Sequence, residues 1–369
     1  MKIALVHDYL TQRGGAERVF ELLCNHFPTA DIYTSVYDRQ NTIELGDRQV
    51  RTTFLQNVPG SRKYFRLFAP FYYSAFRNLN LKEYDLILSS SASFAKGVQK
   101  RSDAIHICFC HNITRFLWDT NTYLREYGAY SIFKPVIEQV FKMMRQQDIS
   151  YAQSPDYYIA NSTTVAKRIE DTYKKDAVVI NYPIDDRRFT FSDQKDGYCL
   201  VSSRHLSYKR LDIIVDAFNS LGLPLIITGE GPETKQLQAR SHDNIQFLGH
   251  VSDLDRCKLM TKAKFVIVAA LEDYGLVPIE ANASGTPVIA YGAGGVMDTQ
   301  ISGLTGLLFE QQTSESLKDA IIKAQEIDWD YVKIRDHAIS NFSESVFFQQ
   351  VDRIVEDICS GKIIKPSEG

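Results

Sequence analysis

The chain contains 369 residues, of which 44% are hydrophobic and 12% aromatic, and it carries a formal net charge of −3. This length is typical of two domains, and the composition supplies enough apolar side chains for two buried cores. A net charge so close to zero argues against a general nucleic-acid-binding protein.

The cysteines and the N-terminus favour an intracellular protein. The six cysteines form no CxxC pair, and Cys108 and Cys110 lie two apart in a strand-like run. Small buried side chains are more common there than metal ligands, so we expect a reducing cytosol. The opening MKIALVHDYL is apolar only as far as Asp8, which predicts a strand and not a signal peptide. No stretch approaches the roughly 18 apolar residues of a membrane-spanning helix.

Strand-like and helix-like runs alternate through the first half of the chain. Residues 2–7 (KIALVH) predict the first strand, and a glycine loop at 13–17 leads into a helix with an apolar face. Further strands are predicted at 31–37, 85–91, 104–109 and 156–161, and the run 175–182 closes this half. Such alternation is typical of α/β domains with a parallel sheet.

The second half repeats the pattern after a polar stretch. Strands are predicted at 198–203, 223–229, 245–249, 264–270 and 287–291, each separated by a helix-like segment. We therefore expect an N-terminal domain at 1–185, a linker at 186–197, and a second Rossmann-like domain at 198–340. The tail at 341–369 has helical periodicity and is expected to pack back on the first domain. Ligands of such sheets bind at the carboxyl ends of the strands, where the strand order reverses.

The segment 269–295 carries the strongest local signal. A strand ends in Leu271-Glu272-Asp273-Tyr274-Gly275, and a helix-like segment with an early proline follows. The backbone N–H groups of Gly275, Leu276 and Val277 would then form an anion site at a helix N-terminus. Two carboxylates flank this turn, Glu272 before it and Glu280 within the helix. Because a carboxylate binds the hydroxyls of a diol well, we interpret the segment as a nucleotide-sugar pocket.

Two other clusters carry charge or backbone amides suited to phosphate. Arg204 and Lys209 follow the end of a strand and can clamp a diphosphate, although a solvated basic loop gives the same pattern. Gly14 and Gly15 allow a close approach of phosphate to the backbone before a helix, although a plain tight turn is the alternative.

These motifs resemble the family 4 retaining glycosyltransferases, which have the GT-B architecture of two Rossmann-like domains facing a central cleft. EDYGLVPIEANASGTPVIA, with Glu272 and Glu280, is similar to the signature of that family. Other motifs follow in the family's order: GGAE, CFCHNITRFLWD, ANSTTVAKRI, SSRHLSYKRLD and ITGEGPE. Within the family, HxxxRxxWD, YKRLD and FAKG resemble bacterial mannosyltransferases of surface polysaccharide synthesis.

The resemblance implies a role for each candidate residue. Arg204 and Lys209 would stabilise the leaving diphosphate, and no metal would be needed. Glu272 would contact the sugar hydroxyls and Glu280 the ribose diol. His111 would lie near the reacting sugar. A nucleotide diphosphate sugar, expected to be GDP-mannose, would bind the C-terminal domain, and a polyprenyl-linked saccharide or other glycan the N-terminal one.

Three further features are open to two interpretations. Arg115 can reach an acceptor phosphate, or it can pair with Asp119 four residues on. Gly231 in GEGPE either shapes the turn near the nucleotide or has a structural role only. Asp253-Leu254-Asp255 mimics a DxD metal motif, but Ser252 or Asp253 is well placed to cap the next helix, so we expect no metal there.

Residues 60–78 (GSRKYFRLFAPFYYSAFRN) combine cations with aromatic side chains and lack acids. The cations Arg62, Lys63, Arg66 and Arg77 would suit an anionic membrane surface, with Pro70 dividing the segment. Residues 133–145 would flank it. Ordinary packing against the first sheet is the alternative. We expect a cytoplasmic protein, peripheral on the membrane.

Three functional hypotheses follow. The first is a retaining hexosyltransferase that uses GDP-mannose, with a UDP-sugar-dependent enzyme of the same fold as its variant. The second is an epimerase or phosphorylase acting on a related sugar phosphate. The third is a non-catalytic, membrane-associated scaffold.

Overall fold

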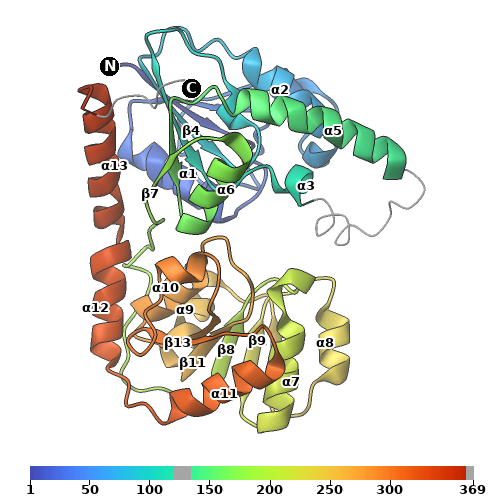
Figure 1. Ribbon diagram of the computed structural model, residues 1–369, viewed down its shortest axis with the longest axis vertical. Helices are drawn as coiled ribbons and strands as arrows, with labels where there is room; N and C mark the ends of the chain where they lie inside the picture. The colour runs from blue at the N-terminus through green and yellow to red at the C-terminus, as the bar shows by residue number, and fades with distance from the viewer. Residues whose placement is uncertain (120–133, 363–369) are drawn as a thin grey trace. The chain divides into compact units, whose positions relative to one another are not determined.

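The computed structural model describes residues 1–119 and 134–362 and divides into two compact units. Unit 1 comprises Met1–Ile180 and Gln350–Gly369, and unit 2 comprises Asn181–Gln349 (Figure 1). Each unit is built around its own parallel sheet with its own hydrophobic core.

Unit 1 contains a seven-stranded sheet in the order β3-β2-β1-β4-β5-β6-β7. Its strands are β1 (Ile3–His7), β2 (Asp31–Thr34), β3 (Val50–Thr52), β4 (Leu86–Ser91), β5 (Ile105–Cys110), β6 (Tyr157–Ala160) and β7 (Ala177–Val179). All neighbouring pairs are parallel, and the strand order reverses between β1 and β4. Every residue of β4 is buried, because helices cover both faces of the sheet.

The helices of unit 1 begin and end at local signals. They are α1 (Gly15–His26), α2 (Ala69–Arg77), α3 (Arg115–Trp118), α5 (Lys134–Tyr151), α6 (Thr163–Tyr173) and the short turns η1 (Phe54–Asn57), η2 (Phe65–Phe68) and η3 (Ala95–Gly97). Ser162 caps α6 by accepting from the Val165 N–H at 3.1 Å. Pro70 lies in the first turn of α2, so the basic aromatic segment is divided there into η2 and α2, as its sequence predicted.

Unit 2 contains a six-stranded parallel sheet in the order β10-β9-β8-β11-β12-β13. Its strands are β8 (Cys199–Ser202), β9 (Leu225–Thr228), β10 (Ile245–Gly249), β11 (Phe265–Val268), β12 (Val288–Tyr291) and β13 (Gly306–Phe309). Its helices are α7 (Leu211–Leu221), α8 (Thr234–Arg240), α9 (Asp253–Lys262), α10 (Leu276–Ala283), α11 (Ser314–Gln325), α12 (Tyr331–Phe342) and the turns η4 (Ser207–Lys209) and η5 (Gly295–Asp298). The strand order reverses between β8 and β11, which is where a doubly wound sheet binds its ligand.

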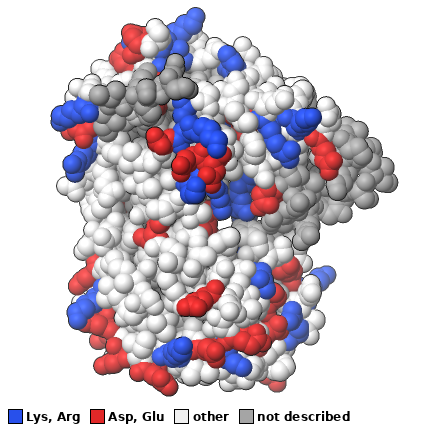
Figure 2. Space-filling view, in the orientation of Figure 1, with Lys and Arg blue, Asp and Glu red and all other residues white. Residues whose placement is uncertain are grey.

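The chain ends in α13 (Glu344–Cys359), whose residues from Gln350 onward belong to unit 1. His26 on α1 lies 2.7 Å from the Asp352 carboxylate of this helix. None of the described helices is both long and apolar enough to cross a membrane. Lys and Arg side chains are interspersed with Asp and Glu over the face seen in Figure 2.

The predicted fold class, two parallel-sheet α/β domains, is confirmed. The strand predicted at 31–37 was too long: β2 ends at Thr34, and beyond it only an isolated bridge joins Tyr37 to Leu10. The strands β3 and β13 were not predicted from the sequence. Ser252 caps α9 by accepting from the Asp255 N–H at 3.1 Å, which confirms the capping interpretation.

Candidate functional site

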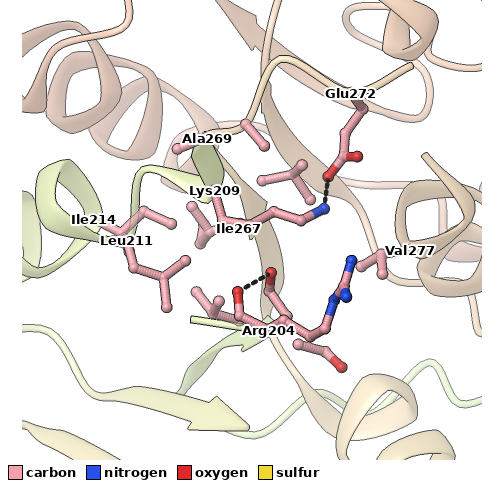
Figure 3. A pocket seen from close by; sticks show the side chains of 13 residues that line it. Arg204, Lys209, Leu211, Ile214, Ile267, Ala269, Glu272 and Val277 are labelled. Atoms are coloured by element: carbon pink, nitrogen blue, oxygen red, sulfur yellow. Dashed lines mark hydrogen bonds and ion pairs between the residues drawn. The ribbon is translucent and has the colours of Figure 1, made fainter. Parts of the chain in front are cut away.

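A cavity of about 220 Å³ lies at the strand-order reversal of unit 2 (Figure 3). Its wall is formed by the carboxyl ends of β8 and β11, the segment after each strand, and the start of α10. The polar and charged lining residues are Ser202, Ser203, Arg204, Lys209 and Glu272, and Val277 adds the first turn of α10. The structure therefore brings together Arg204, Lys209, Glu272 and Val277, four residues that the sequence predicted for the site.

Lys209 and Glu272 form an ion pair within this cavity. The Lys209 Nζ lies 2.6 Å from the Glu272 Oε1, and the two side chains are 17% and 18% exposed. Burial lowers the pKa of Lys209, but the Glu272 carboxylate raises it more, so the pKa lies above its usual value. The ammonium group is therefore charged and partly shielded from solvent, which strengthens its attraction for an anion.

Arg204 adds a second cation to the same wall. Its guanidinium extends toward the Val277 side of the cavity, beside the Lys209 ammonium (Figure 3). Arg210 is turned away by a left-handed backbone (φ 54°) and bonds the Asp212 carboxylate and Gln312. Arg210 is not part of the cavity wall. Arg204 and Lys209 therefore offer two cations to an anionic ligand in this cavity.

The turn before α10 is held close to the neighbouring chain. Gly275 caps the helix with a φ of 90°, a conformation that favours glycine. The Gly295 N–H donates to the Glu272 carbonyl at 2.8 Å, and a side chain at Gly294 would collide with the same carbonyl. This packing fixes Glu272 at the cavity mouth. Leu276 begins α10 but is not part of the cavity wall.

Glu280 lies one turn further along α10 and is buried. Its carboxylate accepts from Arg256 on α9 at 2.5 and 3.4 Å, and the side chain is 5% exposed. Burial lowers the pKa of Arg256, and the Glu280 carboxylate more than offsets this and raises it. Glu280 is not part of the cavity wall, so its contact with a ribose stays a prediction.

Gly231 has a packing role in this structure. A side chain there would lie 2.4 Å from the His205 carbonyl oxygen, and its N–H donates to the Thr234 hydroxyl at 2.9 Å. It does not line the cavity. Of the two interpretations of GEGPE, the structure provides direct support for the structural turn.

In unit 1, His111 lies at the carboxyl edge of the sheet, directly after β5. Its Nε2 lies 2.7 Å from the Ser90 hydroxyl on β4, and that hydroxyl lies 3.0 Å from the Nδ1 of His7 on β1. The His7 Nε2 lies 3.9 Å from the Glu17 carboxylate. We call these four residues the histidine relay. Burial, followed by the nearby His7, lowers the pKa of His111 to about 3, so its imidazole is neutral at physiological pH.

Gly14 and Gly15 begin α1 beside this relay. Gly14 is the N-cap, and a side chain on it would lie 2.7 Å from the Glu17 carboxylate. Glu17 accepts from the Gln12 side chain at 3.0 Å and is buried. The glycine loop is therefore shaped by Glu17. Arg115 begins α3 and lies 3.7 Å from Asp119, the surface pair that the sequence left open as an alternative.

Two family models match the sequence in succession. "Glycosyltransferase Family 4" matches residues 13–188, and "Glycosyl transferases group 1" matches residues 184–342. The two models together match residues 13–342, so the chain belongs to the glycosyltransferases.

Known members of this family resemble the chain at modest identity. An uncharacterized glycosyltransferase of Methanocaldococcus jannaschii is 25% identical over 173 residues, 46% of this chain and 49% of the relative. The phosphatidyl-myo-inositol mannosyltransferase of Mycobacterium leprae is 27% identical over 165 residues, 41% of this chain and 44% of the relative. The chain thus spans about half the length of these curated relatives.

A solved structure extends the likeness to nearly the whole chain. HepE of Anabaena, crystallised in complex with UDP, superposes with a TM-score of 0.70 at 20% identity, covering 97% of this chain and 100% of HepE. This likeness concerns the fold and confirms the predicted GT-B architecture.

Three residues that bond the predicted site residues or their partners were not predicted from the sequence. Ser90 and His7 complete the histidine relay, and Arg256 neutralises Glu280. The histidine at the end of β1 was a usable signal, because parallel strands bring their carboxyl ends to one edge. Arg256 offered no such signal, since it lies on a separate helix 24 residues before its partner.

Proposed function

We propose that this protein is a retaining glycosyltransferase that moves mannose from GDP-mannose to a lipid-linked saccharide or glycan. The observation that carries the proposal is the cavity of unit 2, where Arg204 and the Lys209–Glu272 pair lie at the strand-order reversal. Two cations beside a carboxylate suit a ligand that is anionic at one end and rich in hydroxyls at the other.

The residues divide the chemistry between them. Arg204, Lys209 and the N–H groups at the start of α10 stabilise the negative charge that grows on the leaving diphosphate. They take the role that a metal ion plays elsewhere, so catalysis is metal-independent in this proposal. Glu272 accepts hydrogen bonds from the transferred sugar, and the neutral His111 bonds the sugar from unit 1 without acting as an acid.

Two candidate donors, GDP-mannose and a UDP-sugar, are suggested by the names of similar proteins. The Mycobacterium leprae relative is named a mannosyltransferase, which favours GDP-mannose. The HepE structure holds UDP, which favours a UDP-sugar. The mannosyltransferase match is between sequences at 27% identity, and the HepE match is one of fold at 20%, so we place GDP-mannose first.

The acceptor and the location are proposed from unit 1. Arg62, Lys63, Arg66 and Arg77 lie on the exposed side of η2, α2 and the turn before them, together with exposed aromatic and aliphatic side chains. This mixture suits the cytoplasmic surface of an anionic membrane, where a polyprenyl-linked acceptor is presented.

A thermal-shift panel of GDP, UDP, ADP and their sugar conjugates tests the donor. A ligand at about 100 times its Kd stabilises the folded state by about 2.7 kcal/mol. We expect a shift selective for GDP and GDP-mannose that is lost in Lys209→Ala and kept in Lys235→Ala, an exposed lysine of α8. A shift selective for UDP would overturn the donor only. The absence of any nucleotide shift would overturn the transferase and favour a scaffold.

A further inference from the structure

Unit 1 contains a second cavity, of about 500 Å³, that the donor site does not use. It lies between η2, α2, α3, α5 and the segment after β4, which pack together in this unit (Figure 1). Its walls are mainly aromatic and aliphatic, among them Leu67, Pro70, Phe94, Phe116, Val140 and Met144. Its size and apolar lining are those of a ligand pocket.

The rim of this apolar cavity is exposed and apolar as well. Of the lining residues, Leu67 is 73% and Tyr64 52% exposed, and Phe71, next in the chain to Pro70 of the wall, is 55% exposed. Large apolar side chains grouped in this way mark a binding surface, because leaving them in water is unfavourable. A ligand with a hydrocarbon part would cover both the rim and the walls.

Two cations line the same cavity, and the described lining residues include no carboxylate. They are Lys63 and Arg66, and within residues 1–119 and 134–362 neither forms an ion pair. The Arg66 guanidinium lies 4.4 Å from the centre of the Phe65 ring. A guanidinium can bind a phosphate through two parallel hydrogen bonds. The ligand is therefore expected to be anionic at one end.

The charged end of the cavity adjoins the glycine loop and the histidine relay. Arg66 donates to the Gln12 side chain at 3.1 Å, and Gln12 donates to Glu17 of the histidine relay at 3.0 Å. Ser93 and Phe94 of the cavity wall follow Ser90, which bonds His111. A phosphate on Arg66 would thus place its substituent at the glycine loop and His111.

We propose that this cavity binds the hydrocarbon chain of a polyprenyl phosphate-linked acceptor, with the phosphate on Arg66 and Lys63. The identity of the ligand as acceptor rests on the proposed transferase function. A bulk phospholipid would fill the apolar wall equally well. Its phosphate would bind Arg66 and Lys63 as well, but it carries no saccharide to place at the glycine loop and the relay, which adjoin Arg66 through Gln12.

Direct binding of farnesyl phosphate to the full chain, measured by calorimetry without a donor, tests the cavity. We expect Arg66→Gln to weaken binding about tenfold, as the loss of one charge-assisted contact requires. Lys82→Gln, at an exposed lysine of unit 1 outside both the cavity and the basic aromatic segment, serves as the control and is expected to bind as the wild type does.

A second pair of variants tests the apolar wall. Val140→Trp fills the cavity and is expected to abolish binding, whereas Ile149→Trp, exposed on the same helix, is expected to leave it unchanged. Melting curves of both variants check that the chain is folded. Equal effects of Val140→Trp and Ile149→Trp in folded protein would overturn the proposal.

The outcomes separate this proposal from the transferase. Binding of farnesyl phosphate without any nucleotide shift would keep the cavity and overturn the transferase. A nucleotide shift without farnesyl phosphate binding would do the reverse. Binding only to phosphatidylglycerol vesicles, weakened alike by Arg62→Gln and Arg66→Gln, would replace the chain site by a general membrane surface and overturn the proposal.

Discussion

Two lysine–carboxylate pairs of nearly equal length lie in the two units, and their surroundings differ. In unit 1, Lys96 Nζ lies 2.7 Å from Asp148, and the side chains are 1% and 0% exposed. In unit 2, Lys209 Nζ lies 2.6 Å from Glu272, and the side chains are 17% and 18% exposed. The Asp148 carboxylate also accepts at 2.8 Å from the side chains of Tyr73, Thr114, Trp118 and Tyr173.

The difference shows how to recognise a pair that is kept for a ligand. The oxygens of Asp148 are saturated by neighbours from α2, α3, α6 and η3, so the pair ties these elements together. Within the described part of the chain, the Glu272 carboxylate accepts from Lys209 alone, and the pair opens on a cavity. A substitution that removes the carboxylate charge should therefore lower stability in the unit 1 pair and activity in the unit 2 pair.

Asp148→Asn is expected to cost the most stability. It leaves the Lys96 ammonium buried without a counter-charge, which typically costs about 3–5 kcal/mol. Urea unfolding followed by circular dichroism measures the loss, and the transition of unit 1 is expected to separate from that of unit 2. The double variant Lys96→Met/Asp148→Asn serves as the control and should recover part of the loss. A loss below about 1 kcal/mol in Asp148→Asn would mean that the pair is not structural.

Glu272→Gln, the matched change in unit 2, is expected to cost less stability than Asp148→Asn, since the pair opens on a cavity in which water can solvate the Lys209 ammonium. It should instead lower kcat/KM about 10- to 100-fold, because the sugar loses a charge-assisted hydrogen bond. Binding of the bare nucleoside diphosphate should be kept or become tighter, since Lys209 is released. An equal loss of nucleotide and nucleotide-sugar binding would contradict this division of roles.

The part of the site that sequence predicted is local in the chain. The strand, the turn at Gly275 and the helix with Pro278 follow one another, so their backbone preferences were enough to predict that Glu272 and Val277 lie close together, as they do in the cavity wall. Lys209 could be predicted for the same reason, because it follows Arg204 by only five residues. The fold class followed from the alternation of runs and needed no long-range contact.

The part that sequence did not predict is assembled from distant segments. The Glu280–Arg256 pair joins two helices, and the histidine relay joins residues 83 and 21 positions apart. The unit 1 cavity is built from five separate stretches of chain between Tyr9 and Met144. No short stretch of sequence contains such an arrangement. The local pattern therefore predicted the helices and strands but not which of them would pack together to form the cavity.

The pH dependence of stability offers a further comparison with the buried Lys96–Asp148 pair, because two buried histidines of unit 1 are neutral and not charged. The pKa of His111 is lowered to about 3 and that of His106 to about 4, in both cases mainly by burial. The unfolded chain binds these protons near pH 6.5, so stability is full above that pH and falls as the pH drops toward 3. His111→Gln should make this slope shallower by about one proton, about 1.4 kcal/mol per pH unit. Exposed His250→Gln is the control, and a slope unchanged by His111→Gln would contradict the assignment.

Ser90→Ala should have the smallest effect and is the sharpest test of the histidine relay. It removes both hydrogen bonds of the hydroxyl that joins His111 to His7, and the loss of the bond to His111 is expected to cost about 1 kcal/mol, or about fivefold in rate. If the relay orients His111 toward the sugar, the loss should fall on kcat, with the KM for the donor unchanged, since the cavity proposed for the nucleotide lies in unit 2. Ser90→Thr keeps a hydroxyl and should restore most of the rate. A loss shared equally by Ser90→Ala and Ser90→Thr, or one confined to stability, would leave Ser90 as a packing residue of β4.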